Sequence, residues 1–144
     1  MRVPQHLGIT QTSCRTRRQA RPRDEIRDRA LAIVGECKAY CNAYEEVVRG
    51  NTAGRDSSPA AEKGRQDART YLAQRAAAGL PAGAVAQMLK DQDVKGQAFV
   101  RVWPEFKRQA IEAYWQEHKM EKFFFGEGGR HDFHMFKMLL DGHR

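Results

Sequence analysis

Two cysteines and a group of histidines are the residues whose types and spacing come closest to a chemical site. Cys37 and Cys41 are four positions apart, so a helix would place both thiols on one face. Four histidines follow towards the C-terminus: His118, His131, His134 and His143. Two thiolates with two imidazoles would form a tetrahedral zinc site. Because both cysteines fall within an apolar stripe, where a free thiol packs as a small hydrophobic group, we expect no metal site.

Motifs of known catalytic sites are not found in the sequence. The glycine-rich segment 126–129 lacks the Lys-Ser/Thr ending of a phosphate-binding loop. Glu45 and Glu46 are adjacent, so they would diverge around a helix and form a poor acid/base pair. Three cysteines, an odd number without a secretory signal, indicate reduced thiols rather than a disulfide framework. We therefore expect a protein that is not an enzyme.

Most of the positive charge lies at the N-terminus. The 144-residue chain has a formal net charge of +7. Residues 1–23 contain no acid and six arginines, which are Arg2, Arg15, Arg17, Arg18, Arg21 and Arg23. Subtracting these six leaves +1 for the rest of the chain, which does not provide the positive face that phosphate binding requires. We expect an extended basic arm that acts as a mitochondrial targeting segment, as a strap ordered by a partner, or as both.

Apolar residues recur at steps of three and four from Asp24 onward, which predicts a long amphipathic helix. The stripe consists of Ile26, Ala30, Ile33, Val34, Cys37, Tyr40, Cys41, Tyr44, Val47 and Val48. Gly50 provides the stop. A second helix is expected from Pro59 to about Ala78, with Ser58 as its N-cap.

Shorter or less regular segments follow. A further helix is expected to start at Pro81. The stretch Gln97–Trp103 has strand-like composition, but a lone strand has no partner, so we expect a helix or an irregular connection there. A helical pattern returns over Pro104–Phe125, and after a break at 126–129 a short apolar segment covers His131–Leu140.

The elements together predict an all-α fold: a small antiparallel three-helix bundle over residues 24–125, preceded by the arm at 1–23. Residues 126–144 are expected to form an aromatic C-terminal tail that docks onto partners. The large aromatic residues near this end are Tyr114, Trp115, Phe123, Phe124, Phe125, Phe133 and Phe136. Most should be core, and some should anchor a subunit interface. No apolar run approaches the roughly 20 residues of a membrane span.

A family resemblance is carried by short motifs that occur in order over residues 30–144. They are Gly64-Arg65-Gln66-Asp67-Ala68-Arg69, Lys95-Gly96, Tyr114-Trp115, His118, Met120, Phe123-Phe124, Asp132-Phe133, Phe136 and Gly142-His143. In this order they resemble the LYR-motif accessory subunits of mitochondrial respiratory complex I (NADH:ubiquinone oxidoreductase) that bind acyl carrier protein. At the position of the Leu-Tyr-Arg motif this chain has Ala39-Tyr40-Cys41, followed by Tyr44. The tyrosine matches, whereas the leucine and the arginine are replaced.

The resemblance implies an LYR-like three-helix bundle with no catalytic residues, on the matrix side of the inner mitochondrial membrane. Its partners would be the mitochondrial acyl carrier protein and neighbouring complex I subunits, with no nucleic acid. It would bind no cofactor directly. Instead, the helices would receive the acyl-phosphopantetheine group of the carrier protein.

The same resemblance places cations against the acidic carrier protein and apolar side chains around its acyl chain. The expected carrier-binding residues are Lys38, Tyr40, Tyr44, Arg49, Arg65, Arg69 and Arg75. The expected acyl-chain groove is formed by Ile33, Cys37, Cys41, Tyr71 and Leu72. For any one of these cations taken alone, a solvated surface position is the simpler interpretation.

An RNA-associated protein, such as a mitochondrial ribosomal subunit, is the alternative function. In that case the basic arm at residues 1–23 would run along RNA phosphates. This hypothesis depends on the arm alone, because the rest of the chain is nearly neutral.

Overall fold

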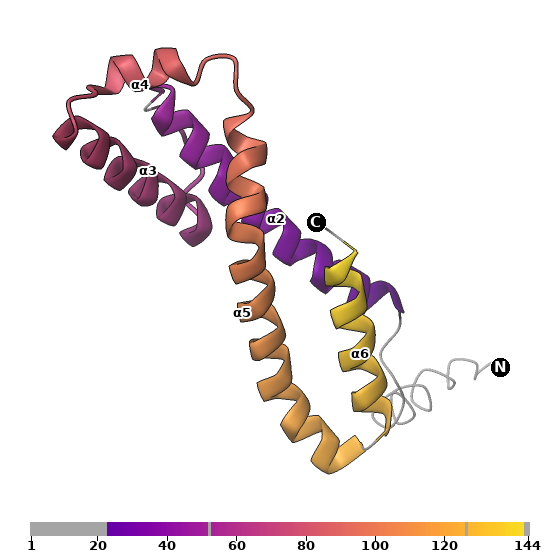
Figure 1. The fold of residues 1–144 in the computed structure, drawn as a ribbon. Helices are drawn as coiled ribbons and strands as arrows, with labels where there is room; N and C mark the ends of the chain where they lie inside the picture. Colours follow the sequence, from indigo (N-terminus) through magenta and orange to yellow (C-terminus); the bar gives the residue numbers. More distant parts are fainter. Residues whose placement is uncertain (1–22, 52, 126, 143–144) are drawn as a thin grey trace. The chain divides into compact units, whose positions relative to one another are not determined.

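The computed structural model describes residues 23–51, 53–125 and 127–142, and all regular structure in these ranges is helical (Figure 1). The helices are α2 (Arg23–Val48), α3 (Pro59–Ala77), α4 (Ala82–Met88), α5 (Val94–Phe125) and α6 (Glu127–Asp141). The expected all-α fold class is therefore confirmed. The basic arm, apart from Arg23, lies outside the described residues. Among the helices described, none combines the length and the apolar character needed to cross a membrane.

The chain divides into two compact units, and α2 and α5 each contribute to both. The central unit consists of residues 33–106 and includes α3 and α4. The terminal unit includes the start of α2, up to Ala32, and the segment Lys107–His143, which contains α6. Each unit has buried apolar residues of its own and is described by itself below.

In the central unit, α2 and α3 approach each other closely at a glycine. Gly64 is buried, and a Cβ atom there would overlap the backbone carbonyl oxygen of Tyr40. The Tyr40 hydroxyl donates a hydrogen bond to Asp67 of α3, and the Tyr44 ring lies 6.3 Å from that of Tyr71. Because these contacts advance together along both helices, α3 runs in the same direction as α2 where they meet.

This direction differs from the antiparallel order that the sequence led us to expect for the first two helices. The connection that follows α2 explains the difference. Residues 53–57 belong to no helix, and Gly54 passes close to the side chain of Glu46, which places the connection back alongside α2. Extended chain rises about 3.3 Å per residue against 1.5 Å in a helix, so a short connection can retrace several helical turns.

The helix α5 is antiparallel to α2 within the central unit. The guanidinium carbon of Arg101 lies 5.1 Å from the Tyr44 ring centroid. One and a half turns later on α5, the Phe106 ring packs edge-on against Tyr40, at 5.8 Å between centroids. The order of contacts therefore reverses between the two helices, as expected for an antiparallel pair.

The stretch Gln97–Trp103 is helical and belongs to α5, which continues through Pro104. A proline inside a helix removes the hydrogen bond to the carbonyl four residues earlier, here that of Val100. The Val100 residue is 70 % exposed, so water can satisfy this carbonyl. Ala98 and Trp103 are buried, and their packing keeps the segment helical.

In the terminal unit, α6 packs its aromatic side against α5 and the start of α2. The rings of Phe136 and Tyr114 lie 4.5 Å apart, and each residue is only 1 % exposed. The Arg29 guanidinium carbon lies 4.3 Å from the Tyr114 ring centroid. Lys107 and Asp141 form an ion pair at 3.1 Å, so α6 runs antiparallel to α5.

The helix α6 begins at Glu127, four residues earlier than the expected segment at His131. It includes Gly128 and Gly129, each of which weakens a helix by about 1 kcal/mol relative to alanine. Burial of Phe136 further along offsets this cost. The aromatic tail predicted from the sequence is thus a packed helix, at least over its described residues.

Candidate docking surface

Three tyrosines of the central unit line one small hollow. Tyr40 and Tyr44 come from α2 and lie 6.2 Å apart, and Tyr71 comes from α3 and lies 6.3 Å from Tyr44. The hollow has a volume of about 220 Å³ and is also lined by Asp67, Thr70, Gln74 and Arg101. The structure thus brings together two predicted carrier-binding residues and one predicted groove residue.

Two of these phenols, those of Tyr40 and Tyr44, are held as neutral hydroxyl groups. Burial, together with the hydrogen bond to Asp67, raises the pKa of Tyr40 above its ordinary value. Burial also raises the pKa of Tyr44, although the nearby Arg101 acts in the opposite direction. The charges at the hollow therefore come from Asp67, which pairs with Lys63 at 3.0 Å, and from Arg101.

Arg101 was not among the cations predicted from the sequence. It lies in the stretch Gln97–Trp103, whose secondary structure was left open between a helix and an irregular connection. Once that stretch is taken as helical, Arg101 falls one turn after the buried Ala98 and next to the face that packs on α2. Helical periodicity was the signal that could have identified it.

A second hollow of the central unit has a volume of about 330 Å³ and a mostly apolar lining. The residues around it are Val47, Gly50, Asn51, Gly54, Arg65, Arg69, Leu72 and Ala82. Gly50 has a positive φ of 89°, which favours glycine and ends α2 at this point. An apolar hollow with arginine at its edge suits a ligand that has a hydrocarbon part and an anionic part.

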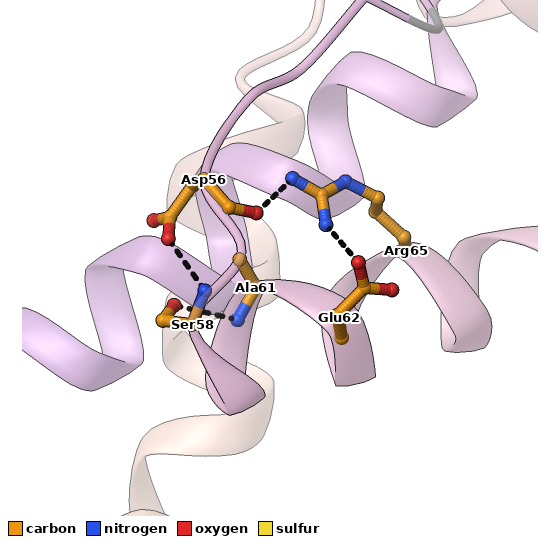
Figure 2. A network of polar contacts seen from close by, with 5 residues as sticks. All are labelled: Asp56, Ser58, Ala61, Glu62 and Arg65. Atoms are coloured by element: carbon orange, nitrogen blue, oxygen red, sulfur yellow. Dashed lines mark hydrogen bonds and ion pairs between the residues drawn. The ribbon is translucent and has the colours of Figure 1, made fainter.

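The Arg65 side chain forms its contacts with other residues of the same chain. Figure 2 shows its guanidinium group between the Glu62 carboxylate, at 2.8 Å, and the backbone carbonyl of Asp56, to which it donates a hydrogen bond. The Asp56 carboxylate accepts from the Ser58 N–H at 2.9 Å, and this bond lowers the Asp56 pKa. Ser58 in turn caps α3 by accepting from the Ala61 N–H at 3.3 Å. Arg65 therefore fastens the connection before α3 to that helix.

Arg49, just after the end of α2, also binds backbone carbonyls of the same chain. It donates hydrogen bonds to the backbone carbonyls of Leu89, at 3.1 Å, and Gln92, at 2.8 Å. It also lies 3.4 Å from the Glu45 carboxylate. These bonds join the end of α2 to the turn between α4 and α5, so this arginine has a direct structural role.

The three other predicted cations have fewer partners inside the described chain. Lys38 and Arg69 are exposed and form no ion pair with a described residue. Arg75 is half-buried, its guanidinium carbon lies 5.8 Å from the Tyr71 ring centroid, and its Nε has no hydrogen-bond partner among the described residues. Of these, only Arg69 lines the apolar hollow.

The five predicted groove residues do not share one groove. Cys37 and Cys41 are completely buried in the core as free thiols. A hydrogen bond with Cys41, together with burial, raises the pKa of Cys37, so its thiol is protonated and unreactive. Ile33 is half-buried on α2, Tyr71 lines the tyrosine hollow, and Leu72 lines the apolar hollow.

Several residues that carry the family resemblance serve the terminal unit. Tyr114 and Phe136 are packed against each other, and Asp132 is buried. The side chains of His118, Met120, Phe123 and Phe124, and the whole of His143, lie outside what the structure describes. Within the described residues, no three His, Cys, Asp or Glu side chains gather in a group that could hold a metal ion.

No family model matches the chain, and no curated protein or solved structure matches it either. The assignment of a function therefore depends on the residues and geometry described above.

Proposed function

We propose that this chain is a non-catalytic accessory subunit of the LYR type, which docks the mitochondrial acyl carrier protein to the peripheral arm of respiratory complex I. It would act on the matrix side of the inner mitochondrial membrane, with neighbouring complex I subunits as further partners. The observation that carries the proposal is the apolar hollow between Val47 and Leu72 with Arg69 at its edge. The order of the sequence motifs supplies the rest of the support.

In this proposal the apolar hollow binds the acyl chain. Its volume of about 330 Å³ lies at the small end of ligand pockets, which hold about 300–1,000 Å³. Val47, Leu72 and Ala82 supply apolar contact at the hollow. Burying hydrocarbon there gains about 0.8 kcal/mol per CH₂ group removed from water, which is enough to favour an acylated carrier over an unacylated one.

In this proposal the cations bind the acidic carrier protein and its phosphate. Arg69 is exposed at the hollow and forms no ion pair with a described residue, so it is available to an acidic partner. Lys38 is a second available cation. Arg101, on α5, is a further candidate, since it stands where the tyrosines gather and the motif arginine has been replaced by Cys41.

The proposed function also implies a particular arrangement of helices. The central parts of α2, α3 and α5 would form the three-helix bundle, with α5 antiparallel and α3 parallel to α2. The buried Cys37 and Cys41 would fill its interior, and the acyl chain would enter beside Leu72 rather than between the two cysteines.

Titration of the purified chain with a mitochondrial acyl carrier protein, in unacylated and dodecanoyl forms, tests this function. We expect the dodecanoyl form to bind at least about tenfold more tightly, because its chain is buried in the hollow. The Arg69→Glu variant should lose about tenfold in affinity for the dodecanoyl form, because it places an acid against an acidic partner. Isothermal titration calorimetry measures both differences.

The matched control is Lys90→Glu, which makes the same change in charge at an exposed lysine of the central unit that lines neither hollow. It should bind as the unmodified chain does. Equal binding of the unacylated and dodecanoyl forms, or equal losses in the two variants, would contradict the proposed docking mode.

A further inference from the structure

One face of α6 carries four side chains of the kinds that coordinate soft metal ions. His131, His134, Met135 and Met138 follow each other at steps of three, one and three residues. Positions three and four apart are neighbours on a helix surface, so each imidazole has a thioether one turn away. The four side chains, together with Leu139, line a single hollow of about 460 Å³.

Among the described residues of the terminal unit, a different side of α6 packs inward. The side of α6 that packs inward carries Asp132, Phe136 and Leu140, which are 2 %, 1 % and 0 % exposed. Met138 is 72 % exposed and His131 is also exposed, on the opposite side of the helix. Within the described residues, His131, His134 and Met138 are exposed and Met135 is half-buried, so this face can take a ligand.

Lys137, a cation of α6 whose side chain the structure describes, makes its contact away from this face. The Lys137 ammonium lies 5.5 Å from the Phe133 ring centroid and interacts with that ring. The hollow is lined by imidazole, thioether and alkyl groups, with no carboxylate among its described lining residues. Such a lining does not suit Mg²⁺ or Ca²⁺, which prefer oxygen ligands.

We propose that this face of α6 binds a soft monovalent metal ion, Cu(I). Thioethers select Cu(I) over zinc and harder ions, and imidazole also binds copper well. The pairs His131 with Met135 and His134 with Met138 each supply one nitrogen and one sulfur four residues apart. Leu139 borders the hollow with apolar surface, which excludes water from one side of the ion.

Replacing the two methionines by leucine distinguishes a metal site from a face that only makes apolar contact with a partner. Leucine is apolar and similar in volume to methionine, so Met135→Leu with Met138→Leu keeps an apolar docking face while removing both sulfur ligands. A face that only contacts a partner protein would be little changed by this pair of substitutions. A Cu(I) site would be lost.

The test is a competition titration of the full chain with Cu(I) under anaerobic conditions, against a chromophoric Cu(I) chelator. Both the reference and the variants carry Cys14→Ser, which removes the one cysteine outside the described core; Cys37 and Cys41 are completely buried. We expect one equivalent to bind, and the double methionine variant to lose at least about tenfold in affinity, the size of effect that lost metal-site contacts produce. The control Met88→Leu, at an exposed methionine of α4, should bind as the reference does.

Nuclear magnetic resonance of methionine methyl groups locates the ion. One equivalent of Cu(I) should shift the Met135 and Met138 methyl signals and leave Met88 unchanged. Unchanged affinity in the double variant would overturn the proposal. So would unshifted Met135 and Met138 signals at one equivalent, or Zn²⁺ binding of equal strength to the same site.

Discussion

Gly64→Ala is expected to lower the free energy of unfolding by about 3 kcal/mol, the upper part of the range for inserting a methyl group into a closely packed contact. The added Cβ would overlap the carbonyl oxygen of Tyr40 and lie 3.0 Å from its carbonyl carbon. These are backbone atoms of α2, so they cannot move aside as a side chain would. The helices α2 and α3 would have to separate, which would weaken the hydrogen bond between Tyr40 and Asp67. Denaturant unfolding followed by circular dichroism measures the change.

Gly35→Ala is the matched control for this substitution. Gly35 also lies within a helix, but a Cβ there would meet nothing within 4 Å. Alanine should therefore stabilise the protein by about 0.5–1 kcal/mol through its higher helix propensity. If Gly64→Ala proved as stable as Gly35→Ala, the close contact between α2 and α3 would be wrong.

Phe136→Ala is expected to cost about 3–5 kcal/mol, because it removes a fully buried aromatic side chain from the terminal unit. Its ring lies 4.5 Å from that of Tyr114 and 5.6 Å from the guanidinium carbon of Arg29. The substitution would leave a cavity at the point where α6 meets α5 and the start of α2. Thermal and denaturant unfolding both measure the loss.

Met138→Ala on the same helix is the control for the Phe136 prediction. Met138 is 72 % exposed, so truncating it should change stability by no more than about 0.5 kcal/mol. A small effect at Phe136, similar to that at Met138, would show that α6 does not pack its aromatic side onto the terminal unit.

Helical periodicity was sufficient to predict the main elements of this chain. The apolar stripe from Ile26 to Val48 predicted α2, and Ser58 followed by Pro59 predicted the start of α3. Both signals are local, since they depend on residues within a few turns of one another. At the start of α5 the same local signals could not decide between a helix and an irregular connection, because long-range packing is what keeps the helix intact through Pro104.

The relative direction of helices could not be read from the sequence. An antiparallel order is usual for helices joined by short connections, and it was expected for α2 and α3. The successive contacts of Tyr40 with Gly64 and of Tyr44 with Tyr71 show a parallel order instead. The first of them involves backbone atoms, which leave no periodic pattern in the sequence. A glycine within a predicted helix was the one clue that the sequence offered.

The sequence could not show which of the predicted cations hold the fold together and which are free to contact a partner. Arg49 and Arg65 bind backbone carbonyls of distant turns, through a pattern that residue type and spacing do not reveal. Arg69 differs from Arg65 by one helical turn, yet it is exposed and forms no ion pair with a described residue. In the sequence the two arginines were equivalent candidates.

The measurement that tests the proposed docking function most directly is intact-mass analysis of whatever co-purifies with the tagged chain under native conditions. The docking function predicts a small acidic protein that carries an acylated phosphopantetheine group, recovered with the unmodified chain and depleted with Arg69→Glu. Complex I subunits should accompany it. Recovery of the chain with ribosomal RNA and ribosomal proteins, or with no carrier protein, would contradict the proposal.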